Sequence, residues 1–136
     1  MIWILDASVA VKWFVDEEHS DKALEILEDI LDHPTNYAIP ELFFFELNHV
    51  IYRVLGSIHK NHKDLLDILA NIGFNRFSVT PEYLEEIHRF QKMGISGYDA
   101  SYLGLAALLK GKWLTFDEAA HKKVIKLGIS KLVSSK

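Results

Sequence analysis

Residues 3–14 read WILDASVAVKWF, and this stretch indicates how the chain begins to fold. The apolar run from Ile2 to Leu5 is continuous, which is typical of a strand buried on both faces. Apolar side chains then return at helical spacing, so Asp6 is predicted to cap a helix that begins directly after the strand. Because burying a charged carboxylate is costly, Asp6 needs a capping bond or another partner at this position.

Short apolar strands and amphipathic helices continue to alternate along the chain. Helices between such strands are typical of a parallel sheet covered on both faces. We therefore predict an α/β fold with three α/β/α layers and a central parallel sheet of about five strands, in a single domain over residues 1–136. The four further strands are expected at Tyr37–Ile39, Phe74–Val79, Trp113–Phe116 and, at one edge, Lys131–Val133.

Capping residues, prolines and glycines predict where the helices begin and end. Ser20 or Asp21 is expected to cap the second helix. Pro40 is expected to open a long helix that runs to about Leu55, with Gly56 as its stop. Further helices are expected at about 60–72, after the Thr80 cap, at 99–109 and from Asp117 to about 127.

Composition limits the possible classes of protein. Of the 136 residues, 49% are hydrophobic and 25% charged, so an ordered globular domain is expected. The absence of cysteine excludes disulfides, thiol catalysis and cysteine-ligated zinc, and it is compatible with the cytoplasmic location that we expect. No leader or membrane-spanning segment is expected. Because the net charge is −4, a nucleic-acid substrate would need bound cations to neutralise its phosphates locally.

Four acidic residues stand at positions that suit a functional site. Asp6 and Asp117 each follow a predicted strand, and their carboxylates meet at one sheet edge if those strands are neighbours. Asp99 stands near a helix start, and Glu46 lies at the edge of an apolar helix face. Structural roles compete with function: capping for the three aspartates, and an ion pair with Arg53 for Glu46.

A cluster of these four carboxylates would predict a bound metal ion. Like charges repel one another strongly unless a cation lies between them. Oxygen ligands without cysteine or paired histidine favour Mg²⁺ or Mn²⁺ over zinc. The pattern therefore predicts a magnesium or manganese site, on the condition that the four segments converge.

Four segments of the chain occur in a characteristic order: ILDASVAVKWF (4–14), PELFFFELNHVIYRV (40–54), SGYDASYLGLAA (96–107) and LTFDEAA (114–120). Together they resemble the PIN domain family, and within it the VapC-type toxin ribonucleases. The resemblance implies a divalent-metal endoribonuclease that hydrolyses RNA phosphodiesters to 5′-phosphate and 3′-hydroxyl products. It assigns the catalytic and metal-binding roles to Asp6, Glu46, Asp99 and Asp117, and supporting polar roles to Ser8, Asn48 and Thr115.

The same resemblance implies partners. It suggests the toxin of a type II toxin–antitoxin pair, held inactive by a cognate antitoxin protein and forming a homodimer. For the RNA substrate, Lys122, Lys123 and Lys126 could contact the backbone, although a solvated helix face is the more ordinary interpretation of such a run.

Two other functions remain open from the sequence. One is a non-catalytic PIN-like module that binds RNA or protein. The other is an aspartyl-phosphate phosphotransferase with Asp6 as nucleophile. Such enzymes usually carry a second acid two residues after the nucleophile, where this chain has Ser8.

Overall fold

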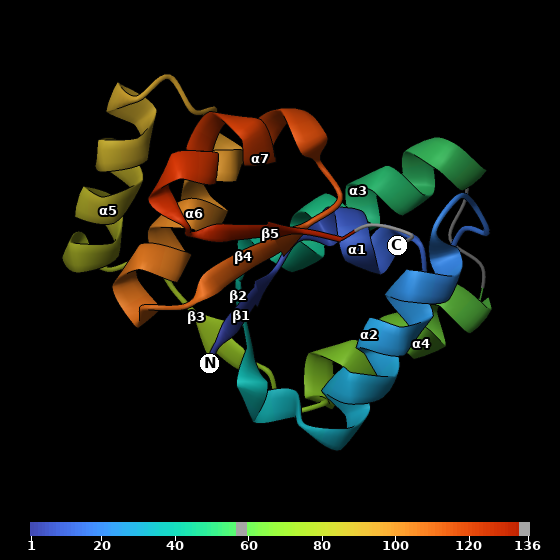
Figure 1. The fold of residues 1–136 in the computed structure, drawn as a ribbon. Coiled ribbons are helices and arrows are strands. Elements are labelled where there is room, and N and C mark those ends of the chain that lie inside the picture. The colour runs from blue at the N-terminus through green and yellow to red at the C-terminus, as the bar shows by residue number, and fades with distance from the viewer. Residues whose placement is uncertain (57–59, 134–136) are drawn as a thin grey trace.

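Short strands alternate with helices along the computed structural model, which describes residues 1–56 and 60–133 (Figure 1). The strands are β1 (Trp3–Leu5), β2 (Tyr37–Pro40), β3 (Asn75–Phe77), β4 (Lys112–Thr115) and β5 (Ser130–Leu132). The helices are α1 (Ala7–Val11), α2 (Ser20–Asp32), α3 (Leu42–Leu55), α4 (Lys60–Asn71), α5 (Pro81–Lys92), α6 (Gly97–Leu109) and α7 (Glu118–Val124), with 3₁₀ turns η1 (Pro34–Asn36) and η2 (Ile125–Leu127).

The strands form one parallel sheet in the order β3-β2-β1-β4-β5. Central strand β1 pairs with β2 on one side and with β4 on the other, so that Ile4 lies between Ala38 and Trp113. The predicted α/β class and the five predicted strands are confirmed, although β3 is shorter than Phe74–Val79. Because the chain leaves β1 toward β2 and later returns on the opposite side, the strand order reverses between β1 and β4.

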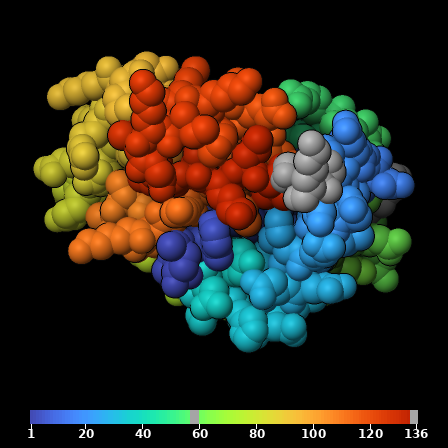
Figure 2. Space-filling model, in the orientation of Figure 1, coloured from blue at the N-terminus to red at the C-terminus, as the bar shows by residue number. Residues whose placement is uncertain are grey.

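Successive strand residues point to opposite faces of the sheet and build two cores. Leu5 and Leu114 belong to the core that α1–α4 cover, whereas Ile4 and Trp113 belong to the core that α5–α7 cover. Each of these side chains is at most 6% exposed, and burying one stabilises the fold by about 1.5–3 kcal/mol. The two layers are visible in Figure 2, where the yellow-to-red segments lie on one side of the molecule and most of the blue-to-green segments on the other.

The predicted start of α2 is wrong. The residue at the N-cap position is His19, in the left-handed conformation with φ of 68°. Ser20 is already helical, and its Oγ accepts a hydrogen bond from the backbone N–H of Glu17 instead of capping the helix. The hydroxyl therefore stabilises the preceding loop, so neither Ser20 nor Asp21 has the predicted capping role.

The predicted start of α3 is also wrong. Pro40 is the last residue of β2, where it lies opposite Phe77 of β3, and the helix begins only at Leu42. Proline fits this place because it needs no ladder hydrogen bond at a strand end. The other boundary signals hold: Gly56 ends α3 with φ of 73°, and Thr80 Oγ1 accepts from Tyr83 N at 3.2 Å at the start of α5.

Helix length also bears on the expected absence of a membrane span. Within residues 1–56 and 60–133, the structure contains no helix that combines the length and apolar character needed to cross a bilayer.

Candidate functional site

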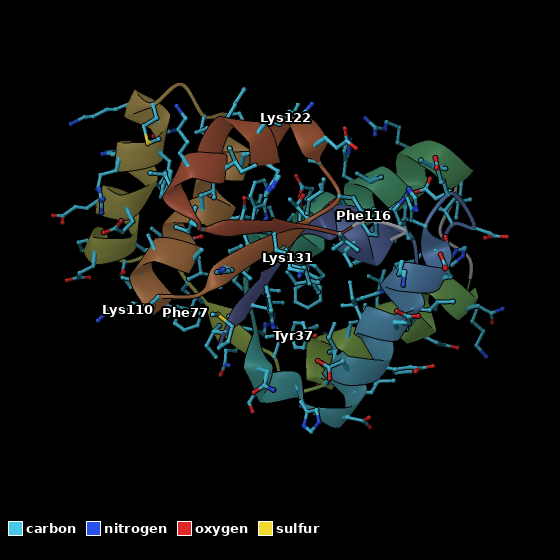
Figure 3. All side chains as sticks on the ribbon, viewed as in Figure 1. Tyr37, Phe77, Lys110, Phe116, Lys122 and Lys131 are labelled. Atoms are coloured by element: carbon cyan, nitrogen blue, oxygen red, sulfur yellow. The ribbon has the colours of Figure 1, made fainter. Side chains whose placement is uncertain are left out.

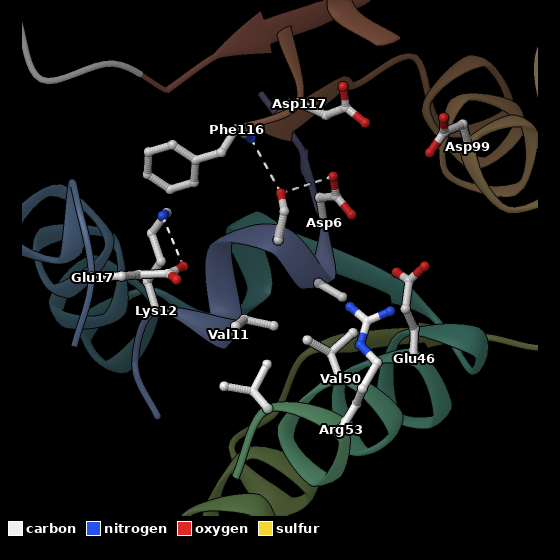
Figure 4. A pocket seen from close by; sticks show the side chains of 13 residues that line it. Asp6, Val11, Lys12, Glu17, Glu46, Val50, Arg53, Asp99, Phe116 and Asp117 are labelled. Atoms are coloured by element: carbon white, nitrogen blue, oxygen red, sulfur yellow. Dashed lines mark hydrogen bonds and ion pairs between the residues drawn. The ribbon is translucent and has the colours of Figure 1, made fainter. Parts of the chain in front are cut away.

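A pocket of about 460 Å³ opens beyond the carboxyl ends of β1 and β4, where the strand order reverses (Figure 4). Its walls include all four predicted acids: Asp6 after β1, Glu46 on α3, Asp99 on α6 and Asp117 after β4. The predicted adjacency of the first and fourth strands is confirmed, because β1 and β4 pair directly. Parallel pairing delivers both strand-end carboxylates to the same edge of the sheet.

Two hydroxyl groups hold the Asp6 side chain, which is 6% exposed. Ser8 Oγ and Thr115 Oγ1 both donate to Asp6 Oδ2, at 3.0 and 2.5 Å. The hydroxyls are in turn positioned by backbone N–H groups, because Phe116 N donates to Ser8 Oγ at 3.2 Å and Asp117 N donates to Thr115 Oγ1 at 3.0 Å. The segment after β4 therefore fixes the carboxylate that follows β1.

The predicted capping role of the Asp6 side chain is wrong. Asp6 occupies the N-cap position of α1, but its carboxylate makes no cap hydrogen bond and turns toward β4 instead. Burial raises the pKa of Asp6 to about 7, and the hydroxyl bond from Thr115 offsets part of that rise. The negative charge of Glu46 raises the pKa further. A nearby cation would strongly stabilise the charged form of a carboxyl that is buried and close to another negative charge.

Glu46 is held by Tyr102, a residue that the sequence analysis did not identify. Tyr102 Oη donates to Glu46 Oε1 at 2.8 Å, and the Tyr102 ring stacks on Trp113 with centroids 6.1 Å apart. Burial raises the pKa of Glu46, the bond from Tyr102 lowers it, and the charge of Asp99 raises it again. The sequence does contain a signal for this residue: Tyr102 stands three residues after Asp99, and this spacing places both on the same face of one helix.

The structural alternative for Glu46 was an ion pair with Arg53, and this pair is not formed among the described residues. Arg53 does line the same pocket. The carboxylate of Glu46 is therefore oriented by a neutral hydroxyl rather than by an ion pair.

Asp99 and Asp117 occupy different positions at their helix starts. Ser96 is the N-cap of α6, where its Oγ accepts from Asp99 N at 3.4 Å, so the Asp99 side chain is not the cap. Burial raises the pKa of Asp99, and the charge of Asp117 adds to that rise. Asp117 does cap α7, because its Oδ1 accepts from Ala120 N at 3.0 Å. Asp117 thus has both the predicted structural role and a place in the pocket wall.

The donor groups of this pocket fit a hard divalent cation. Its walls carry carboxylates and a serine hydroxyl, and none of the described lining residues is a histidine. Within residues 1–56 and 60–133, no group of three or more Asp, Glu or His side chains is arranged so that it could hold a metal ion by itself. Mg²⁺ tolerates this arrangement because it keeps several waters and binds few protein ligands directly. Burial is the main cause of the raised pKa values of Asp6, Glu46 and Asp99, and in each case the charge of a neighbouring carboxylate adds to the rise.

The remaining predicted residues lie outside the pocket lining. Asn48 is exposed and lines a separate groove between α3, α4 and β3. Lys122, Lys123 and Lys126 are exposed on α7 and the turn that follows it, and Figure 3 shows Lys122 on the side of α7 away from the sheet. Of the three lysines, Lys123 is near enough to Asp99 to lower the pKa of that carboxyl slightly.

Comparison with known proteins identifies the family. A toxin–antitoxin complex from Klebsiella pneumoniae is similar in structure, with a TM-score of 0.67 and 16% identity over 94% of this chain and 94% of that chain. A chain of VapBC2 from Rickettsia felis, bound to a promoter DNA fragment, has a TM-score of 0.68 and 21% sequence identity, over 98% of this chain and 100% of that chain. PAE2754 from Pyrobaculum aerophilum has a TM-score of 0.64 and 22% sequence identity, over 90% of this chain and 79% of that chain.

At these identities the solved structures establish a shared fold. No curated protein sequence matches the chain significantly. A family model for the PIN domain matches residues 3–126, which is most of the chain and includes all four pocket acids. The protein therefore belongs to the PIN domain family.

Proposed function

We propose that this protein is an endoribonuclease that hydrolyses RNA phosphodiesters with Mg²⁺ or Mn²⁺. One observation carries the proposal: four carboxylates from four separate elements line one pocket at the switch point of a parallel sheet. Membership in the PIN family supports the same conclusion. Asp6, Glu46, Asp99 and Asp117 would hold the ion or ions, directly or through water.

The cation, when bound, supplies a water of lowered pKa and neutralises charge on the attacked phosphate. The protein residues prepare the site for it. Ser8 and Thr115 fix Asp6 Oδ2, so the carboxylate keeps one orientation toward the pocket. Tyr102 fixes Glu46 in the same way. Asp117 is anchored through Oδ1, which leaves Oδ2 for the ion or for the attacking water.

The cellular role that we propose is that of a toxin restrained by a cognate antitoxin. The support is the similarity in fold to one chain from each of two solved toxin–antitoxin assemblies, and the matched VapBC2 chain is covered over 100% of its length. Homodimer formation and a cytoplasmic location belong to the same proposal. Expression of the protein alone should inhibit growth, and co-expression with a small DNA-binding protein encoded beside its gene should relieve that inhibition and yield a stable complex by size-exclusion chromatography.

Cleavage of RNA by Asp→Asn variants tests the nuclease proposal directly. Asp6→Asn and Asp99→Asn should each lower the Mn²⁺-dependent cleavage rate by at least about 100-fold, because each removes a charged ligand from the pocket. Circular dichroism should show intact folding. The measurement is gel analysis of a structured RNA digested with Mg²⁺, with Mn²⁺ and with EDTA.

A matched control is Asp64→Asn on α4, an exposed aspartate that does not line the pocket. This variant should cleave RNA at the wild-type rate. Full activity in both Asp6→Asn and Asp99→Asn would show that the site is wrongly assigned. RNA binding without cleavage in every metal titration would instead favour a non-catalytic RNA-binding module.

A further inference from the structure

The charges of the pocket do not suffice for a polyanionic substrate. Among the described lining residues, five are carboxylates, the four predicted acids and Glu17, and two are cations, Lys12 and Arg53. Two bound divalent cations would carry four positive charges and would only balance the four predicted acids. An RNA strand brings one negative charge per nucleotide, so the phosphates beside the reacting one need a cation from the protein.

Lys12 is already engaged within the fold. Its Nζ pairs with Glu17 Oε1 at 3.0 Å, donates to the carbonyl oxygen of Glu18 at 2.8 Å and lies 4.7 Å from the centroid of the Phe116 ring. The Lys12 side chain is only 12% exposed. The ring of Phe116 stacks in turn against His19, with centroids 6.0 Å apart. Lys12 thus ties the loop between α1 and α2 to the segment after β4.

Arg53 is the other of these two cations, and it has no protein partner in the part of the chain that the structure describes. Among the described residues it forms no ion pair, side-chain hydrogen bond or ring contact, and its side chain is exposed on the last turns of α3. Figure 4 shows its guanidinium directed into the pocket, above Val50 and on the opposite side of Asp6 from Phe116. A guanidinium presents a planar fork of donors that matches phosphate oxygens.

We infer that Arg53 binds a phosphate of the RNA strand adjacent to the phosphate that is cleaved, and is the principal protein cation for substrate binding in this pocket. The inference rests on the proposed ribonuclease function. We expect Arg53 to contribute more to RNA binding than the three lysines suggested by the sequence, Lys122, Lys123 and Lys126. These exposed lysines are not among the lining residues of the pocket, whereas the guanidinium of Arg53 points into it.

Steady-state cleavage of a fluorogenic single-stranded oligoribonucleotide tests this role. With Mn²⁺ present, Arg53→Gln should raise KM about tenfold and change kcat less than threefold, because a charged hydrogen bond to the bound strand is lost while the acids remain. Arg53→Lys should recover part of the affinity, since a point charge replaces the fork. The slope of log kcat/KM against log salt should become shallower by about 0.7, as expected for one lost phosphate contact in a single strand.

The matched control is Arg89→Gln on α5, which removes an exposed arginine that pairs with Glu86 and is not among the lining residues of the pocket. It should leave KM, kcat and the salt slope unchanged. The rise in melting temperature on adding Mn²⁺ should be the same in Arg53→Gln as in the wild type, because Arg53 is not assigned to the ion.

The outcomes separate this inference from the proposed function. If the wild type cleaves RNA but Arg53→Gln keeps the wild-type KM and salt slope, the assignment of Arg53 is overturned and the nuclease proposal stands. A loss of Mn²⁺ stabilisation in Arg53→Gln would also overturn it, because the arginine would then organise the acids. If the wild type cleaves no RNA with either metal, both proposals fail.

Discussion

Tyr83 and Tyr102 both bury a phenolic hydroxyl, but these hydroxyls have different partners. Tyr83 Oη donates to the carbonyl oxygen of Ser101 at 2.6 Å and so connects α5 to α6. Tyr102 Oη donates to Glu46 Oε1 at 2.8 Å and so connects α6 to the pocket. Both side chains are at most 2% exposed. Removing each hydroxyl in turn therefore distinguishes the loss of a structural hydrogen bond, at Tyr83, from the loss of a hydrogen bond to a pocket residue, at Tyr102.

Tyr102→Phe should reduce RNA cleavage about tenfold and shift its pH dependence. The lost hydrogen bond stabilises the charged form of Glu46, so its removal raises the pKa of Glu46 and moves the acidic limb of the pH–rate profile to higher pH. Tyr83→Phe should cost similar stability, about 1 kcal/mol, without altering that profile. Identical pH–rate profiles for the two variants would contradict a positioning role for Tyr102.

At the scale of elements, helices α5 and α6 pack closely because of one glycine. A Cβ added at Gly104 of α6 would lie 3.0 Å from both the backbone N and Cγ1 of Ile87 on α5. This close approach allows α5 to cover α6, while Tyr102 of α6 packs on Trp113 of β4 in the same core. The first turn of α6 carries Asp99, so the packing of this helix helps to determine where that carboxylate lies in the pocket.

Gly104→Ala should destabilise the protein by about 1–3 kcal/mol, because the added methyl group meets backbone atoms that cannot move aside without separating the helices. Gly97→Ala, at the first position of the same helix, is the control. Its Cβ would approach only the flexible end of Gln91, at 3.6 Å, so it should be neutral or stabilising by up to about 1 kcal/mol. Urea denaturation of both variants measures the difference, and equal midpoints would refute the packing argument.

For the whole molecule, the acidic pocket opposes folding when no cation is bound. Asp6 has a pKa of about 7 in the folded protein and an ordinary value of 3.8. Between these two values the folded state keeps a proton that the unfolded state has lost, so the free energy of unfolding decreases as the pH rises from about 4 to 7. Above pH 7 the penalty is complete, whereas below pH 4 this contribution vanishes.

The metal-free protein should therefore lose up to roughly 4 kcal/mol of stability from Asp6 across this pH range, since each tenfold change in proton affinity corresponds to about 1.4 kcal/mol. Asp6→Asn should flatten the pH dependence and be more stable than the wild type at pH 8 in EDTA. Mn²⁺ should raise the melting temperature of the wild type, increasingly so at higher pH, and should have little effect on Asp6→Asn. Parallel melting curves from pH 5 to 8 for the two proteins would contradict this account.

Local signals predicted much of the fold and the identities of the four pocket acids. Apolar runs such as Ile2–Leu5 predicted the strands, because burial on both faces of a parallel sheet demands them. The Ser20 and Pro40 predictions failed because each residue found a nonlocal or backbone partner that outweighed its helix preference. Capping was likewise an insufficient account of Asp6, whose carboxylate binds Thr115, 109 residues away.

The sequence by itself determined that carboxylates would follow β1 and β4, because periodicity and strand length are local properties. Only the tertiary structure decided that β1 and β4 are neighbours, that Tyr102 holds Glu46 and that the guanidinium of Arg53 points into the pocket. It also decided that Asn48 lies in a separate groove. The physical reason is that sheet order and helix packing bring together residues far apart in the chain, and the hydrogen bonds and charges of a site depend on those contacts.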